Sequence, residues 1–383
     1  MATGRATPPL LKDLNERTVL DAIRSYSPVS RAEISRRVGI SKPTVSLALQ
    51  SLLDAGLVRE TAPDGDGPSY GAVFFEPVPE AAYVLGLDVG ARFVRGALCD
   101  LTGDVRARQD VELSERTSTA ALDAIETLWE SLLATSADVE IDGVVVGVPG
   151  AVLNRRITLA ENVAGLEGEQ FAEELRERLD RDVTIENDIN LAALGEQWRG
   201  VARGVDDFAF ISIGTGLGAG LVLRGELHRG RGGAAGELDY ARVGLSEDFD
   251  PCAGALCELT RELAHGRRTT LESPYDTRLI FAAARAGDAV ALEVVAEEAR
   301  RIALHIAPIA AVADVGLVVL GGGIGANGDL LYDGIRRLLA EWLPEPPRVE
   351  TSSLGDAAVL TGALAVGRRA ALDNVFVQRR ARA

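Results

Sequence analysis

The chain has few cysteines and no long apolar run, and each absence excludes a class of protein. Three cysteines among 383 residues are too few for the disulfide framework of a small secreted protein. No apolar stretch approaches the roughly 20 residues that a membrane-spanning helix needs. The first residues, MATGRATPPLLKDLNERT, also lack the apolar segment of a signal peptide. We therefore expect a cytoplasmic protein with no membrane partner.

Positive charge is also scarce, but the shortage is uneven along the chain. The sequence has 40 Lys and Arg against 57 Asp and Glu, a net charge of −17, which argues against a surface coated with nucleic acid. Residues 1–62 nevertheless hold nine Lys/Arg and six Asp/Glu, a net charge of +3, so the remainder carries −20. A basic N-terminal segment on an acidic body predicts that only this segment meets DNA.

The basic segment has the pattern of a helix-turn-helix. Apolar residues at helical spacing predict a first helix that ends before Pro28. Ser30 is a candidate cap for a second helix, over residues 31–39. Ser41 is a candidate cap for a third helix, with Pro43 in its first turn. A short helix, a glycine turn and a helix that starts with small polar residues together predict DNA binding.

Two predicted strands, LVRE and AVFFE, follow the third helix and are expected to form a wing. We therefore expect a winged helix-turn-helix domain over residues 1–76 and a Pro-rich linker over 77–82. The wing turn 63–71 contains aspartate and no Lys or Arg, so a minor-groove contact is expected from Arg59 or Arg5 instead.

The third helix is expected to lie in the major groove with its N-terminal residues at base edges. Long polar side chains suit base edges, and hydroxyl groups suit phosphates. The candidate DNA-binding residues are Arg31, Lys42, Thr44, Ser46 and Gln50. The expected partner is double-stranded DNA with a palindromic operator, bound by two heads of a dimer.

The body begins with three consecutive predicted strands and later repeats the same plan. Residues 83–113 and 208–230 share the order strand, glycine turn, strand, turn, strand. Strands and helices then alternate, including a strand expected over 316–325. We expect a duplicated α/β fold with a cleft, a first lobe over 83–190 and a second over 191–383, whose C-terminal helix is free to return to the first.

Five motifs of the body carry a family resemblance. They are DVG at 88–90, VGVPG at 146–150, ENDIN at 186–190, SIGTGLGAG at 212–220 and AAGE at 234–237. Together with the winged-helix head they resemble the ROK family, which comprises repressors, open-reading-frame proteins and sugar kinases. The resemblance covers nearly the whole chain. It implies an actin/hexokinase-like ATPase fold of two lobes.

The resemblance also implies a sugar pocket. Asp188 matches the residue that binds hexose and acts as general base in the kinases. From the sequence alone, Asp188 is equally a candidate for the cap of a helix. The implied ligand-binding residues are Asn162, Asn187, Asp188, Glu237 and Tyr240, where Tyr240 stands in place of the family's histidine.

Two departures from the kinase pattern argue against catalysis. In the first phosphate loop, 88-DVGAR-92, Ala91 replaces a glycine and Arg92 replaces a threonine, and we expect Arg92 to fill the space of ATP. The later glycine turns are expected to be retained for folding. The vestigial nucleotide-loop residues are Asp88, Gly90, Gly214, Thr215, Gly216, Gly322 and Gly323. No catalytic residue is expected, and Asp188 is a vestigial base.

The second departure concerns the family's zinc loop. Of its cysteines only Cys252 and Cys257 remain, and Tyr240 replaces the histidine ligand. Structural zinc needs four nitrogen or sulfur ligands, so neither zinc nor another cofactor is expected.

The sequence thus predicts a transcriptional regulator, in particular a repressor, with a degenerate sugar-kinase-like body that senses a carbohydrate or derivative. A homodimer or a dimer of dimers is expected. Two alternatives stay open: an active ATP-dependent sugar kinase with a DNA-binding head, and a DNA-binding regulator with no small-molecule ligand.

Overall fold

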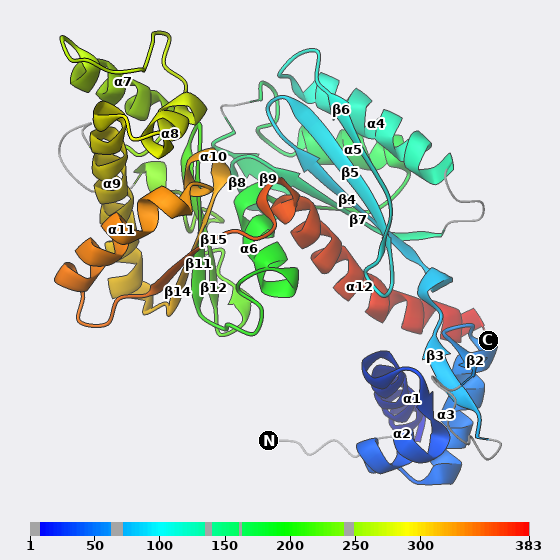
Figure 1. Ribbon diagram of the computed structural model, residues 1–383. Coiled ribbons are helices and arrows are strands. Elements are labelled where there is room, and N and C mark those ends of the chain that lie inside the picture. Colours follow the sequence, from blue (N-terminus) through cyan, green and yellow to red (C-terminus); the bar gives the residue numbers. More distant parts are fainter. Residues whose placement is uncertain (1–7, 63–71, 135–139, 161–162, 241–248, 383) are drawn as a thin grey trace.

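The computed structural model describes residues 8–62, 72–134, 140–160, 163–240 and 249–382. A small N-terminal domain lies beside a larger body of two lobes (Figure 1). The expected turn of the wing, 63–71, lies outside the described residues.

The N-terminal domain is a winged helix-turn-helix. Ser30 and Ser41 accept hydrogen bonds from the backbone N–H groups of Glu33 and Thr44, which confirms both predicted caps. Gly39 lies between the two helices with φ of +68°, a conformation that favours glycine. The strands pair antiparallel in the order β1-β3-β2. The elements are α1 (Pro8–Tyr26), β1 (Val29–Ser30), α2 (Arg31–Val38), α3 (Lys42–Asp54), β2 (Val58–Thr61) and β3 (Phe74–Pro77).

The segment expected to be a linker is a packed joint. It contains a short 3-10 turn, η1 (Pro79–Ala81), and both Ala81 and Ala82 are buried. Because these residues contribute to the core that joins the N-terminal domain to the C-terminal helix α12 (Ala358–Arg382), the segment is not a flexible linker.

The first lobe is built on a five-stranded sheet of order β10-β7-β4-β5-β6. β4, β5 and β6 form an antiparallel meander, and β7 and β10 extend it in parallel. Two helices pack on one face. The elements are β4 (Tyr83–Val89), β5 (Phe93–Asp100), β6 (Val105–Glu112), α4 (Ser118–Ala134), β7 (Ile141–Val148), β8 (Ala151–Leu153), β9 (Arg156–Thr158), α5 (Gln170–Leu179) and β10 (Val183–Asn187).

The second lobe repeats this topology in the order β13-β12-β11-β14-β15, as the duplicated pattern predicts. The strand expected over 316–325 ends at Gly321, because Gly322 turns into a short helix. The elements are β11 (Phe208–Ile213), β12 (Leu217–Leu223), β13 (Glu226–Leu227), η2 (Leu238–Tyr240), α7 (Ala253–Ala264), α8 (Thr277–Arg285), α9 (Ala289–Ala313), β14 (Leu317–Gly321), α10 (Gly322–Gly325), α11 (Gly328–Trp342), β15 (Arg348–Thr351) and η4 (Gly355–Ala357).

Two helices, α6 (Asp188–Arg199) and α12 (Ala358–Arg382), pack against each other between the sheets (Figure 1). Their backbones approach closely at glycines. A Cβ on Gly362 would lie 1.8 Å from the Leu191 carbonyl oxygen, and one on Gly195 would lie 2.3 Å from the Ala358 carbonyl oxygen. α12 also covers β4 and β7 of the first sheet.

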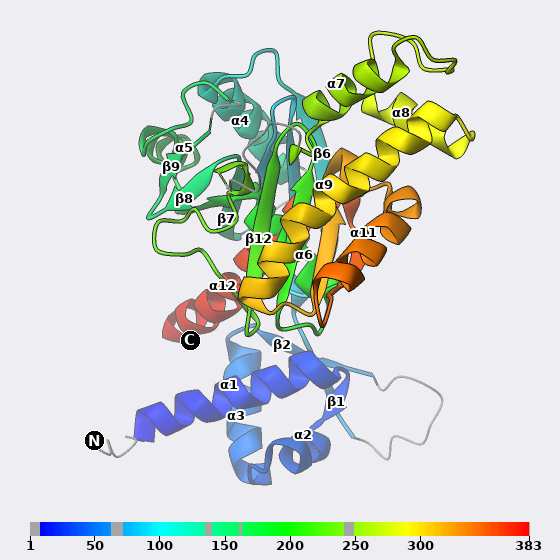
Figure 2. The ribbon, with the colours of Figure 1, turned by 90° about the vertical axis from the view of Figure 1, so that its left-hand side faces the viewer.

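The far end of α12 meets the N-terminal domain (Figure 2). Arg17 of α1 forms an ion pair with Asp373 at 3.0 Å and stacks over the ring of Phe376. α12 therefore runs from the space between the lobes to the helix-turn-helix.

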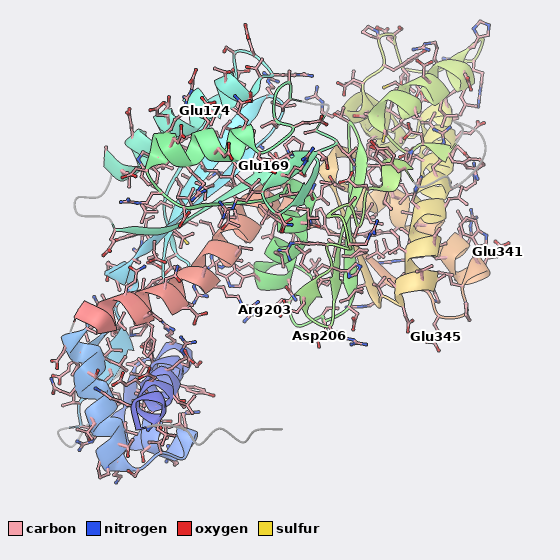
Figure 3. All side chains as sticks on the ribbon, turned by 180° about the vertical axis from the view of Figure 1, so that it is seen from behind. Glu169, Glu174, Arg203, Asp206, Glu341 and Glu345 are labelled. Carbon is pink, nitrogen blue, oxygen red and sulfur yellow. The ribbon has the colours of Figure 1, made fainter. Side chains whose placement is uncertain are left out.

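Carboxylate side chains lie on the outer surface of both lobes. Glu169 and Glu174 on one lobe and Glu341 and Glu345 on the other are labelled in Figure 3. No helix among the described residues is long and apolar enough to cross a membrane.

Candidate DNA interface and effector cleft

The recognition helix α3 presents polar side chains at a spacing of four residues, on one face. Lys42 and Gln50 are exposed, and Ser46 between them is half-buried. Arg31 of α2 donates a hydrogen bond to the Ser46 hydroxyl at 3.2 Å, so α2 places a guanidinium beside this face. Thr44 is half-buried, with its hydroxyl 2.8 Å from the cap hydroxyl of the helix.

One exposed residue of α3 is apolar. Leu47 is 73% exposed and lies away from the buried stripe of the helix. An apolar side chain in the major groove contacts the methyl group of thymine. Leu47 is therefore an additional candidate for base contact.

Ion pairs within the protein compete with the expected minor-groove contact of Arg59. Its guanidinium is 2.6 Å from Glu76 on the neighbouring strand and 3.5 Å from Glu80. These two carboxylates hold Arg59 at the base of the wing. Arg5, the other candidate, lies outside the described residues.

In the body, Asn187 and Asp188 mark the junction of β10 and α6. The cap of α6 is Asn187, whose side-chain oxygen accepts from the Asn190 N–H at 2.8 Å and whose amide donates to the Gly150 carbonyl at 2.9 Å. The hypothesis that Asp188 caps the helix is therefore wrong by one residue. Asp188 is the first helical residue, and its carboxylate accepts from the Ile189 N–H at 2.8 Å.

Glu237 is positioned by the glycine before it. Gly236 has φ of +94°, and a Cβ there would collide with the Ala219 carbonyl oxygen. The Gly236 carbonyl accepts from the Ala219 N–H at 2.7 Å, which fixes this segment against β12. Only glycine permits this close contact between residue 236 and the Ala219 backbone. The contact brings Glu237 within electrostatic range of Asp188.

Three of the predicted residues, Asp88, Asp188 and Glu237, thus form an acidic cluster in which the charges of Asp88 and Glu237 act on Asp188. Burial, together with the charges of Asp88 and Glu237, raises the pKa of Asp188 to about 7. Burial also raises the pKa of Asp88 to about 6, against the opposing effect of Arg95. The pKa of Glu237 is raised by burial and by Asp239. A group that donates hydrogen bonds, such as a sugar hydroxyl, stabilises carboxylates in this setting.

Arg95 pairs with Asp88 across the β4–β5 hairpin. The two residues are directly opposite in the strand register, and the guanidinium donates to the carboxylate at 3.0 Å. Arg95 also lies 3.7 Å from Asp110 on β6. In a kinase loop the carboxylate at the position of Asp88 would act on phosphate or its metal. Here Asp88 is instead paired with the Arg95 side chain.

The expectation for Arg92 is wrong. Its side chain is 74% exposed and pairs with Glu112 on β6 at 3.1 Å, instead of filling the nucleotide space. At this hairpin the carboxylate of β6 competes for the guanidinium, so Arg92 turns outward while Arg95 turns to Asp88.

The later glycine loops adjoin one another. Gly214, Thr215 and Gly216 form the tight turn between β11 and β12. A Cβ on Gly214 would lie 4.0 Å from the Gly323 nitrogen, while one on Gly322 would collide with the Ile213 backbone. Gly322 is therefore required by close packing of the chain, as expected for a turn retained for folding.

Comparison with known proteins gives the family. The model of the ROK family matches residues 84–370. The chain belongs to the ROK family. A model of the MarR family matches residues 13–67, the helix-turn-helix part. The xylose repressor of Caldicellulosiruptor bescii is 25% identical over 388 residues, covering 93% of this chain and 96% of that protein.

Two solved ROK structures resemble the structure of this chain. A ROK family transcriptional regulator described as a homologue of the E. coli MLC protein superposes with a TM-score of 0.81, at 23% identity, over 97% of this chain and all of its own. That likeness shows the fold, head included. A ROK family glucokinase from Streptomyces griseus, in complex with glucose and AMPPNP, gives a TM-score of 0.64 at 26% identity over 75% of this chain and all of that one.

The described residues of the ROK zinc loop do not form a metal site. Cys252 is buried at the start of α7, and the thiol of Cys257 donates to the Tyr275 carbonyl at 3.4 Å. Burial raises the pKa of both thiols, whereas zinc binds thiolates. Among the described residues, no group of three His, Cys, Asp or Glu side chains is placed to bind a metal ion. Tyr240, in place of the ROK histidine, is 60% exposed.

Some functional residues were absent from the sequence-based set. The pairing of Arg95 with Asp88 could have been predicted from the sequence, because a short hairpin turn places residues 88 and 95 opposite each other. The ion pair between buried Glu186 and Arg229, at 2.7 Å, joins the two lobes and had no local signal. Asn162, expected at the pocket rim, lies outside the described residues.

Proposed function

We propose that this ROK protein is a sequence-specific DNA-binding repressor whose body senses a carbohydrate. The observation that carries the proposal is a recognition helix tied to a sugar-kinase-like body through α12 and the Arg17–Asp373 pair. The full-length similarity to a xylose repressor supports it.

The cleft offers the chemistry that a sugar needs. Asp188 and Glu237 are acceptors for hydroxyl groups, and they lie close enough for the charge of Glu237 to act on Asp188. A hydroxyl that donates to Asp188 favours the charged carboxylate and offsets the effect of burial on its pKa. A ligand that bonds to both residues stabilises the arrangement in which the lobes are close.

The signal is proposed to travel along α12. The helix begins next to η4, whose Asp356 is close enough to Asp88 to raise its pKa, and it ends against α1. In a homodimer, two heads must lie about one helical turn of DNA apart to bind a palindrome. A small movement of α12 in each protomer therefore changes the spacing and releases the operator.

Selection of bound duplexes from a random DNA library tests the DNA-binding part. We expect an enriched palindrome whose affinity falls steeply with salt concentration, because phosphate contacts release counterions. Weak binding without enrichment, in the presence and absence of a panel of sugars, would contradict the proposal.

A second candidate function is phosphorylation of a sugar. Asp188 favours it, since a base with a pKa of about 7 is poised to accept a hydroxyl proton at neutral pH. Arg95 opposes it by pairing with Asp88. Release of ADP from ATP with a panel of hexoses distinguishes the two: a repressor gives none above the level of the Asp188→Asn variant.

A further inference from the structure

A small cavity lies at the joint between the N-terminal domain and the body. It measures about 100 Å³ and has walls from α1, the strands of the wing, the end of β5 and α12. Arginines from both sides face it, and none of the described residues that line it is acidic. The lining residues are Arg24, Leu57, Pro77, Val78, Leu101, Thr102 and Arg368.

Neither arginine has a close, buried counterion in the described part of the chain. Arg24 is only 19% exposed, and its partner Asp21 lies 3.4 Å away and is 60% exposed. Arg24 also donates a long hydrogen bond, 3.5 Å, to the Leu372 carbonyl. Arg368 donates through Nε to the Leu101 carbonyl at 2.7 Å, a neutral acceptor.

The two nearby carboxylates have other partners. Asp373 pairs with Arg17 at 3.0 Å. Asp100 is bound by Arg106 and by the backbone N–H groups of the turn that follows it. Burial lowers the pKa of both Arg24 and Arg368, and the charge of Arg368 lowers that of Arg24 further. Two guanidinium groups that repel each other in a confined space are stabilised by an anion between them.

We infer that this joint cavity binds one tetrahedral oxyanion, either inorganic phosphate or the phosphoryl end of a small metabolite. Guanidinium groups bind phosphate oxygens in pairs of parallel hydrogen bonds. The cavity has the volume of about three water molecules at ~30 Å³ each, which suits one such anion. Bound to Arg24 of the head and Arg368 of the body, it fixes the two domains relative to each other.

The test is thermal melting and isothermal titration calorimetry of the full-length protein with sodium phosphate. Sodium chloride at equal ionic strength is the reference. We expect a saturable rise in melting temperature, and an apparent phosphate affinity that falls roughly tenfold or more in Arg24→Gln and in Arg368→Gln. Arg369→Gln is the matched control, because that neighbouring side chain is 80% exposed; it leaves the affinity unchanged.

A second arm uses glucose 6-phosphate. A response to inorganic phosphate shows that the free anion suffices, whereas a response to glucose 6-phosphate alone assigns the site to a phosphorylated metabolite. In both cases the response must be lost in Arg24→Gln and in Arg368→Gln. If Arg368→Gln does not fold, Arg24→Gln and the broadening of the phosphate ³¹P signal by the wild-type protein decide the question. No saturable effect, or an equal effect in the variants, overturns the inference. The inorganic phosphate arm uses neither DNA nor sugar, so its outcome is independent of the proposed function.

Discussion

At the residue scale, the cleft combines three carboxylates with one internal cation. Arg95 neutralises Asp88 at 3.0 Å, while Asp188 and Glu237 carry raised pKa values. In a phosphate-binding loop a free carboxylate is needed for the metal that accompanies the nucleotide. In the proposed sensor, the pairing of Asp88 with Arg95 leaves Asp188 and Glu237 as the groups that would bind a neutral ligand such as a sugar.

The raised pKa of Asp188 predicts how stability depends on pH. Folding keeps this carboxyl group protonated up to a pH of about 7, whereas in the unfolded chain it ionises near pH ~4. Its contribution to stability is therefore complete below pH ~4 and is lost as the pH rises towards 7. Asp188→Asn removes this loss, so the variant should exceed the wild type by about 4 kcal/mol at pH 8 and by little at pH 4.

Urea unfolding across this pH range measures the effect. Asp182→Asn is the control, because it makes the same charge change at a side chain that is 90% exposed. A stability difference between Asp188→Asn and the wild type that is constant with pH would contradict the account.

Leu47 gives a prediction for DNA recognition. If its exposed side chain contacts a thymine methyl group, replacing that thymine by uracil in the selected operator weakens wild-type binding by about 0.8 kcal/mol, the value of one buried methylene. In Leu47→Ser the same base change has no effect. Fluorescence anisotropy on the two duplexes measures this, with Leu279→Ser, 61% exposed in the body, as control. If replacing thymine by uracil weakens binding by Leu47→Ser as much as binding by the wild type, Leu47 does not contact the methyl group.

At the element scale, α6 and α12 form the link between the lobes. Their contact depends on Gly362, where any side chain meets the Leu191 carbonyl. Gly362→Ala should therefore destabilise the protein by about 1–3 kcal/mol through overpacking. Gly254→Ala in α7, where nothing lies within 4 Å of the added Cβ, should be neutral or stabilising because alanine is the better helix former. Differential scanning calorimetry compares the two, and equal melting temperatures would refute the role of the contact.

Much of the element order was predictable from the sequence, because strands, glycine turns and caps have local signals. The caps at Ser30 and Ser41 and the duplicated meanders are examples. The return of the C-terminal helix to the first lobe was anticipated, and α12 covers β4 and β7. Its contacts with α6 and with the N-terminal domain were not predictable, since periodicity shows that a helix has a buried face but not what covers it. The outward turn of Arg92 depends on Glu112 of another strand, which has no local signal.

At the scale of the whole molecule, the head, the cleft and α12 form one connected path. Residues of α12 pack with α1, β4 and α6, so the helix contacts the DNA-binding domain, the first sheet and the helix that follows β10. Under the proposed function, these packed contacts are the route by which a ligand that changes the distance between the lobes would act on the head.

The most direct test of this account is the release of a labelled operator, followed by fluorescence anisotropy while sugars including xylose and glucose are added. The account predicts that one sugar weakens operator binding by the wild-type protein roughly tenfold or more. The same sugar should have little effect on Asp188→Asn and full effect on Asp182→Asn. Operator binding that no sugar alters, together with an unchanged melting temperature, would contradict carbohydrate sensing and leave a DNA-binding regulator without a small-molecule ligand.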